Sequence, residues 1–396
     1  MEEVVIVSAV RTALGKIGGT LKNVQPEDLA TLVMKESVQR AQIKPENIDE
    51  VIFGQTKQSA DAANIARVAA LRAGIPIEVP AFTVMRQCGS GLQAVNNAAE
   101  AIMCGRANVI VAGGTESMSN APYYLRNARY GYGAGNAVLV DSNTESQPGS
   151  QPREVYGELT MGLTAENLAV KYGISREEQD EFALMSQQRA AQAISQGRFQ
   201  DEIVPVVIPQ RKGESIVFDT DEFPRKTSLE HLAKLKPVFK AGGTVTAGNS
   251  SGRNDGAASL VIMSAKEAQR NNLKPLAILL GHAAAGVSPE IMGIGPAPAM
   301  RRALRMAGLS ISDIGLIELN EAFAAQSLAV IKELDLNKEI VNVNGGAIAL
   351  GHPLGCSGAR ILTTLIHEMK KRQVRYGAAT LCIAGGQGIA SVVELA

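Results

Sequence analysis

The sequence predicts an α/β fold built from two similar halves, and three repeated landmarks support that prediction. The landmarks are a helix followed by a strand, a glycine-rich turn opening a helix, and an apolar strand beside a pair of glycines. They occur at residues 34–55 and 300–321, at 88–91 and 355–358, and at 109–114 and 380–386. The offset is 266 residues from Ile48 to Ile314 and 267 residues from Ser90 to Ser357. Three landmarks in one order at nearly one offset indicate an internal duplication.

The duplication also predicts how the 396 residues divide, because a chain of this length exceeds one ordinary core. Residues 1–118 form the first half, which residues 251–269 complete, and residues 270–396 form the second. Residues 119–250 have no counterpart and are expected to form an inserted loop or lid domain over the face that carries the glycine turns. Because strands alternate with helices, we expect largely parallel sheets with helices on both faces.

Individual elements follow from local patterns along the chain. An apolar strand begins at the start of the sequence, a helix covers residues 92–103, and the strand at residues 109–114 ends in a glycine turn. In the insert, a polar glycine-rich loop spans residues 131–152. A helix follows that begins with the capping box Ser175…Glu178 and ends at Gly197. Further strands are expected at residues 203–208, 216–218 and 315–319, and before Cys382.

Composition excludes several classes of protein. The chain has 39 basic and 39 acidic side chains and no Trp, so neither a basic field nor a base-stacking surface for nucleic acid is expected. No apolar run has membrane-spanning length, and the first residues do not resemble a signal peptide. The four cysteines form no C-x-x-C pair, which argues against a metal site or a disulfide framework. We therefore expect a cytoplasmic protein with reduced thiols that binds neither membranes nor metal.

Cys88 is the candidate nucleophile, because it lies between glycine-rich residues directly before a helix. The positive end of a helix dipole lowers a thiol pKa and increases the thiolate fraction. A buried, inert cysteine is the alternative, and it is the interpretation we adopt for Cys104 and Cys356.

Three further residues have settings suited to catalysis. Cys382 ends an apolar strand, at the sheet edge where α/β proteins bind ligands, and it would face Cys88 across the two halves. His352 lies in the loop Gly351-His352-Pro353 rather than on a helix face, unlike His231, His282 and His367, which are interpreted as structural. Asn320 follows a strand and could orient a water or donate into an oxyanion hole, with neighbouring Glu321 as an alternative general base.

Together these segments resemble the thiolases along essentially the whole chain. The motifs that carry the resemblance are residues 84–91, 112–118, 244–249, 320–323, 345–353 and Cys382. The resemblance implies the thiolase fold, in which two α/β halves form five layers (α-β-α-β-α) with an inserted loop domain. It also implies reversible condensation of two acetyl-CoA to acetoacetyl-CoA and CoA by a ping-pong mechanism, with coenzyme A as substrate and product and no other cofactor.

The same resemblance implies a role for each site residue. Cys88 becomes acetylated, and Cys382 acts as acid and base on the acetyl-CoA methyl group. His352 activates Cys88 and, with a water held by Asn320, forms one oxyanion hole. The backbone N–H groups of Cys88 and Ala384 form the second.

The resemblance further implies the residues that bind the substrate. Ser251 and Phe239 line the pantetheine tunnel, Met161 and Met292 flank the acyl group, and Arg225 reaches the nucleotide end of CoA. Phe323, in the motif at residues 320–323, is also expected to contact substrate. Thr160 stands where many short-chain thiolases have His, which leaves strict acetoacetyl-CoA specificity open.

Three alternatives remain at this point. The first is a 3-ketoacyl-CoA thiolase of fatty-acid β-oxidation with a broader chain-length range. The second is a decarboxylating condensing enzyme, which would not need a second catalytic thiol. The third is a non-catalytic acyl-CoA-binding scaffold, which would be expected to lose Cys382 or His352. The resemblance also suggests a homo-oligomer, either a dimer or a dimer of dimers.

Overall fold

The computed structural model describes residues 2–396, and its centre is one eleven-stranded mixed sheet. Nine strands form its continuous path, and β2 (Gly15–Lys16) and β8 (Ile203–Val204) pair beside it with β11 and β1. In spatial order the nine are β13 (Leu316–Leu319), β14 (Tyr376–Ile383), β15 (Gln387–Leu395), β12 (Ala277–Gly286), β1 (Val4–Thr12), β11 (Asn254–Ser264), β5 (Val109–Ser117), β3 (Glu50–Gly54) and β4 (Ala81–Val84).

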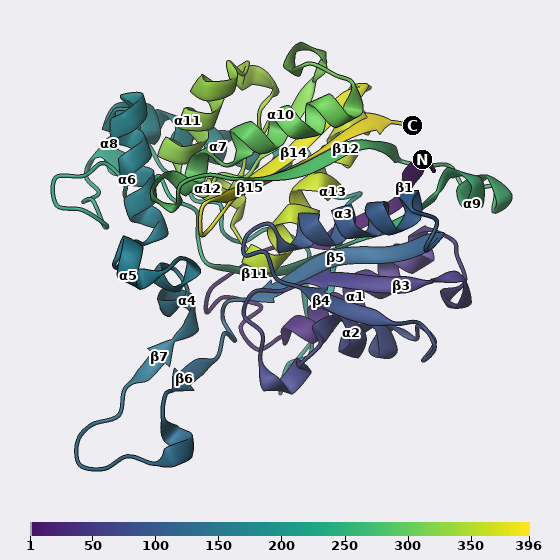
Figure 1. The fold of residues 1–396 in the computed structure, drawn as a ribbon, viewed down its shortest axis with the longest axis horizontal. Coiled ribbons are helices and arrows are strands. Elements are labelled where there is room, and N and C mark those ends of the chain that lie inside the picture. Colours follow the sequence, from purple (N-terminus) through teal and green to yellow (C-terminus); the bar gives the residue numbers. More distant parts are fainter. Residues whose placement is uncertain (1) are drawn as a thin grey trace.

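The helices and the two halves of this sheet together form five layers (Figure 1). Helices α3 (Ser90–Met103) and α13 (Leu354–Arg372) pack on each other in the middle, between the first-half and second-half strands. Helices α1 (Pro26–Arg40) and α2 (Ile65–Ala73) cover the outer face of the first half, and α10 (Pro296–Ala307) with α11 (Ala324–Leu334) covers the second. The α-β-α-β-α arrangement predicted from the sequence is confirmed.

The two halves repeat the same order of elements, as the duplication requires. Helix α1, strand β3, helix α3 and strand β5 of the first half correspond to α10, β13, α13 and β14 of the second. The halves join where β1 pairs antiparallel with β12, at Val5 with Ile278 and at Ile6 with Ala277. The predicted boundaries at residues 118, 250 and 270 stay a prediction about folding units.

The expectation of largely parallel sheets is wrong. Among the strands that the structure describes, only β3 with β4, β3 with β5, β13 with β14, and the short β8 with β1 pair in parallel. The long strands β1, β11, β5, β12, β14 and β15 pair antiparallel with one another. The reason is local in the second half, where Gly385 and Gly386, at φ +86° and +84°, turn β14 directly back into β15. A tight turn of this kind joins antiparallel neighbours and leaves no room for a crossover helix.

The predicted glycine turn after residues 109–114 is also absent, because β5 continues to Ser117 through both glycines. A Cβ on Gly114 would lie 2.0 Å from the carbonyl oxygen of Gly355, at the start of α13. These glycines therefore serve close packing of a strand against a helix end, and no change of chain direction occurs there.

The chain between β5 and β11 carries several short elements. Helices α6 (Met161–Tyr172) and α7 (Arg176–Ser195) pack beside α11, and α7 has the predicted Ser175–Glu178 capping box. The others are β6 (Tyr123–Leu125), β7 (Leu139–Asp141), α4 (Ser142–Glu145), α5 (Arg153–Tyr156), β9 (Val206–Ile208), β10 (Ile216–Phe218) and α8 (Leu229–Ala233). Two short helices lie outside the insert, α9 (Ala265–Arg270) and α12 (Ala347–Leu350).

Residues 121–141, which contain β6 and β7, form an arm that projects away from the rest of the molecule (Figure 1). No helix within residues 2–396 combines the length and the apolar character that crossing a bilayer requires.

Candidate active site

A cavity of about 200 Å³ opens where the two halves and the insert meet. The first half contributes Cys88, and the second half contributes His352 and Ala384. Met161 comes from the N-terminus of α6 in the insert. The sequence-predicted nucleophile and imidazole therefore face one common space.

The turn that presents Cys88 is tightly held. Gln87, directly before it, has a positive φ of 43°, which is an uncommon conformation for a residue other than glycine. Ser90 fixes this turn, because its Oγ accepts from the Arg86 N–H at 2.8 Å and donates to the Gln87 carbonyl at 2.7 Å. Strained backbone at a nucleophile is a common way to hold a reactive side chain in place.

The expected lowering of the Cys88 pKa is not found. Burial raises the pKa of the Cys88 thiol to about 11, although backbone N–H groups of Ala384 and Cys88 itself and the charge of Lys57 act in the opposite direction. Burial outweighs the helix end because it removes water from the anion on every side. Cys88 is therefore a thiol at neutral pH and needs a base in order to react.

His352 has the properties of that base. Burial, with the charge of Arg360, lowers the pKa of His352 to about 3, so the imidazole is neutral. Its Nδ1 lies 2.6 Å from Ser357 Oγ, and that hydroxyl donates its only proton to the Pro353 carbonyl at 2.8 Å. The hydrogen-bond network thus assigns the proton to Nδ1 and leaves Nε2 as the proton acceptor.

Asn320 lies behind His352 rather than on the cavity wall. Its Nδ2 is 3.4 Å from His352 Nε2, and its backbone N–H donates to the Thr380 carbonyl at 3.0 Å. Asn320 is buried, yet its Oδ1 has no hydrogen-bond partner within the described chain. A buried amide oxygen of this kind needs a donor, and a water molecule is the simplest one.

Cys382 is fully buried near the end of β14 and belongs to the apolar core of the second half. Burial raises the pKa of Cys382, and the charge of Cys88 raises it further. The two thiols, one from each half, are therefore electrostatically coupled, and their joint action on one substrate stays a prediction.

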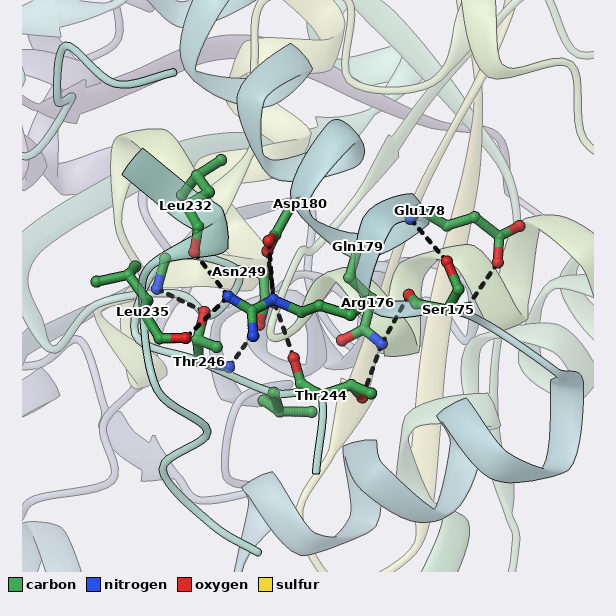
Figure 2. Close-up of polar contacts among 12 residues, drawn as sticks. Ser175, Arg176, Glu178, Gln179, Asp180, Leu232, Leu235, Thr244, Thr246 and Asn249 are labelled. Carbon is green, nitrogen blue, oxygen red and sulfur yellow. Dashed lines mark hydrogen bonds and ion pairs between the residues drawn. The ribbon is translucent and has the colours of Figure 1, made fainter. Parts of the chain in front are cut away.

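Hydrogen bonds tie the motif at residues 244–249 to helix α7 (Figure 2). Asn249 Nδ2 donates to Asp180 Oδ1 of α7 at 2.9 Å and to the Thr244 carbonyl at 3.1 Å. Arg176 bonds Asp180 from the same helix at 2.8 Å. Ser251, two residues after Asn249, donates its backbone N–H to the Ala322 carbonyl at 3.0 Å. This bond joins the segment to the motif at residues 320–323.

Most of the predicted substrate-binding side chains line the cavity. They are Met161, Phe239, Ser251, Met292 and Phe323. Phe239 and Phe323 meet edge to face, with ring centroids 6.0 Å apart. Arg225 does not line the cavity, and its guanidinium lies over the Phe223 ring at 5.0 Å. A contact of Arg225 with the nucleotide end of CoA stays a prediction.

Comparison with known families decides the relationship. The N-terminal thiolase domain matches residues 4–266, and the C-terminal thiolase domain matches residues 273–395. The chain belongs to the thiolase family.

Relatives of this thiolase match it over nearly their whole length. It is 55% identical to an acetyl-CoA acetyltransferase of Syntrophomonas wolfei over 396 residues, which is 99% of each chain. It is 52% identical to an acetyl-CoA acetyltransferase of Chromobacterium violaceum over 393 residues, again 99% of each.

Solved structures agree with the fold. The acetyl-CoA acetyltransferase of Bacillus anthracis superposes with a TM-score of 0.97 at 50% identity, covering 100% of this thiolase and 99% of that chain. The human mitochondrial 3-ketoacyl-CoA thiolase superposes with a TM-score of 0.95 at 46% identity, covering 100% and 99%.

The structure of this thiolase gives Glu321 a structural role in place of the alternative role of base. Its carboxylate accepts hydrogen bonds from Ser186 Oγ at 2.7 Å, Asn342 Nδ2 at 2.8 Å and the Ile348 N–H at 3.1 Å. It is buried and does not line the cavity. Glu321 therefore ties α7 to the loop that leads to His352.

Sequence reasoning missed a buried charged pair beside the nucleophile. Lys57 is 5% exposed and Glu116 is 0% exposed. Glu116 accepts the backbone N–H groups of Thr56, Lys57 and Gly355 at 2.9 to 3.1 Å, so it holds the entrance of α13 against the first half. The motif at residues 112–118 contained Glu116, but no local pattern distinguishes a buried carboxylate from an exposed one. Lys57 had no such signal.

Sequence reasoning also gave no account of the polar loop before α5. In the structure α4 and the 3-10 turn η4 (Pro148–Ser150) bring Asn143, Ser146, Gln147 and Ser150 onto the cavity wall.

Proposed function

We propose that this thiolase catalyses the reversible condensation of two acetyl-CoA molecules to acetoacetyl-CoA and CoA, through an acetyl-Cys88 intermediate. The observation that carries the proposal is the meeting of Cys88 and His352, one from each half, at one cavity, with Cys382 electrostatically coupled to Cys88. The names of the full-length relatives support the acetyl group as substrate.

In the first half-reaction, Cys88 attacks the thioester carbonyl. The Sγ proton moves to His352 Nε2, the Sγ–C bond forms, and the C–S bond to CoA breaks with return of the proton to the leaving thiolate. The backbone N–H groups of Ala384 and Cys88, which act on the Cys88 sulfur, are placed to stabilise the developing oxyanion.

In the second half-reaction, Cys382 removes a proton from the methyl group of the second acetyl-CoA. Burial raises the pKa of Cys382, and a negative charge on Cys88 would raise it further. Acetylation leaves Cys88 a neutral thioester that cannot ionise, so no thiolate at residue 88 opposes the deprotonation of Cys382 in this step. A water that donates one proton to the unpartnered Asn320 Oδ1 would have its other proton free to stabilise the enolate oxygen.

Intact mass spectrometry after incubation with acetyl-CoA tests the proposal. An acetyl adduct is expected on the native protein and on Cys382→Ser, but not on Cys88→Ala. Cys382→Ser should load acetyl without forming acetoacetyl-CoA. Absence of any adduct that depends on Cys88 would refute the mechanism.

A 3-ketoacyl-CoA thiolase of broader chain length is the second candidate. It is favoured by the similarity to the human mitochondrial enzyme and by Thr160, whose side chain caps α6 at Leu163 N instead of supplying an imidazole. Thiolysis rates measured from four to twelve acyl carbons separate the two candidates.

We further propose that the protein acts in lipid metabolism in the cytoplasm as a homo-oligomer, a dimer or a homotetramer arranged as a dimer of dimers. No cofactor beyond CoA as substrate and product enters the proposal. The arm at residues 121–141 supports self-association, because it exposes seven large apolar side chains. These are Tyr123, Tyr124, Leu125, Tyr130, Tyr132, Val138 and Leu139. The four free cysteines support a reducing compartment.

A further inference from the structure

One continuous polar stretch of the catalytic cavity wall comes from a single segment of the insert. This stretch is the segment at residues 142–151, here called the polar lid, and its cavity-lining side chains are Asn143, Ser146, Gln147 and Ser150. Methionine and phenylalanine side chains face it from elsewhere in the fold. A pocket that held only an acetyl methyl group would not need hydrogen-bonding groups on this side.

Asn143 presents an acceptor without a donor. Its side chain is buried, at 7% exposure, and its Nδ2 donates to the Met118 carbonyl at 2.9 Å. That bond fixes the amide and turns Oδ1 away, and Oδ1 has no partner within residues 2–396. An unpaired buried acceptor is costly, so a donor from a bound molecule is favoured at this point.

Ser146 presents a donor beside it. Its Oγ accepts a hydrogen bond from the buried Lys57 ammonium, which also donates to the Ser142 carbonyl at 3.1 Å. Because the Ser146 oxygen is already an acceptor, its hydroxyl proton is free to point into the cavity. The Lys57 charge polarises this hydroxyl and makes it a better donor.

The polar lid is locked next to the nucleophile. Ser150 Oγ accepts from Gln87 Nε2 at 3.2 Å, and Gln87 precedes Cys88. The same hydroxyl donates to the Ser146 carbonyl at 2.7 Å. The acceptor on Asn143 and the donor on Ser146 are therefore held in a fixed relation to the reacting sulfur.

We propose that the acyl site beside Cys88 prefers a short acyl group that carries a hydroxyl over a methyl-terminated group of the same size. A hydroxyl both donates and accepts, so it satisfies Asn143 Oδ1 and the Ser146 hydroxyl at once. The inference rests on the proposed function and names a substrate class for it. The transfer step is unchanged: the thioester bond to CoA breaks, the bond to Cys88 Sγ forms, and the hydroxyl of the acyl group does not react.

Pairs of acyl-CoAs of equal size test the inference. Hydroxyacetyl-CoA is compared with propionyl-CoA, and 3-hydroxypropionyl-CoA with butyryl-CoA, by the rate of adduct formation on Cys88 in the full-length protein. The native protein should load the hydroxyl member of at least one pair about tenfold faster, as expected for a buried hydrogen-bonded group.

Two substitutions locate the effect. Asn143→Leu and Ser146→Ala should each reduce the ratio of hydroxyl to methyl loading about fivefold or more. Thr144→Ala, on the same helix but exposed and outside the cavity, should leave the ratio as in the native protein. The second variant keeps the test valid if the first does not fold.

The outcomes separate this inference from the proposed function. Acetyl loading on Cys88 combined with equal or faster loading of the methyl-terminated acyl groups overturns the inference and leaves the proposed function standing. The same holds if the hydroxyl preference survives both substitutions. Failure of acetyl-CoA itself to load Cys88 overturns both.

Discussion

His352 is held in one protonation state and one tautomer by its neighbours. Burial and Arg360 lower its pKa to about 3, and Ser357 takes the Nδ1 proton as a hydrogen bond. Cys88 shows the opposite shift, with its pKa raised to about 11. Between these two values the pair is a neutral thiol beside a neutral imidazole, which is the reactant state for proton transfer.

The pH dependence of acetylation should reflect this pair. Because neither group titrates between about pH 4 and 10, the rate of acetyl-Cys88 formation is expected to be flat from pH 5.5 to 8.5. Single-turnover mass spectrometry across this range measures it. A tenfold loss per pH unit below pH 6.5 would contradict the depressed pKa of His352.

The matching control replaces the base. In His352→Gln the thiolate must form without help, so the rate should fall at neutral pH. It should then rise about tenfold per pH unit toward the pKa of Cys88.

At the scale of single residues, the sequence alone identified the candidate catalytic residues but not the direction of their pKa shifts. Cys88, His352 and Cys382 stand out because glycines and a strand end give each an unusual local setting. The direction of the Cys88 pKa shift was predicted wrongly, because burial depends on residues from both halves. Lys57 was missed for the same reason, since its role comes from the distant Ser142 and Ser146.

Strand β5 of the first half packs closely against helix α13 of the second. The strand passes the carbonyl of Gly355 so closely that Gly114 has no room for a side chain, and Glu116 on the same strand accepts the Gly355 N–H at 2.9 Å. This contact sets the start of α13 and hence the loop that carries His352.

Gly114→Ala should therefore destabilise the protein. The added Cβ would meet backbone at 2.0 Å, and backbone cannot move aside as a flexible side chain can. Overpacking of this kind costs about 1–3 kcal/mol or more, and chemical denaturation measures it. Gly133→Ala, in the arm with nothing within 4 Å, is the matched control. Equal stability of the two variants would contradict the packing described for β5.

Most elements were predictable from the sequence, but their pairing was not. Helices α1, α3, α7 and α10 and strands β1, β3 and β13 follow from apolar periodicity and capping. Strand direction does not, because antiparallel pairing of β5 with β11 depends on where the chain returns after the insert, between Ser117 and Asn254. The two glycines in β5 were predicted to form a turn, because a local pattern does not reveal that Gly114 packs against Gly355 of the other half.

On the scale of the whole molecule, the arm at residues 121–141 stands out because the rest of the protein does not bury it. A row of exposed tyrosine and aliphatic side chains on a projecting segment is typical of a contact between subunits.

Replacing Tyr124 and Leu139 with Ser should lower the oligomeric state by one step. The double variant removes apolar area from both strands of the arm, and multi-angle light scattering measures the mass. Val170→Ser is the control, because Val170 is more exposed than Tyr124 or Leu139, at 76%, but lies on α6 away from the arm. An unchanged mass in the arm variant would exclude the arm from the interface.

Buried thiols should make the fold sensitive to alkali. The pKa values of Cys88 and Cys356 are raised to about 11 and about 12, and that of Cys382 is raised as well. The unfolded chain loses these protons near pH 9, so folding stability is complete below that pH and declines as pH rises toward 11. Thermal unfolding from pH 7 to 10.5 should show a falling Tm. A smaller fall is expected in Cys356→Ala, and an identical curve would exclude a contribution from this thiol.

The catalytic cavity takes Cys88 from one half of a duplicated chain and His352 from the other, so neither half contains a working centre. Recovery of the ability to acetylate Cys88 and then condense a second acetyl group is thus an unusually strict reporter of renaturation. Spectroscopic signals of regained helix can appear while the two halves are still apart, but turnover returns only when the halves have packed against each other.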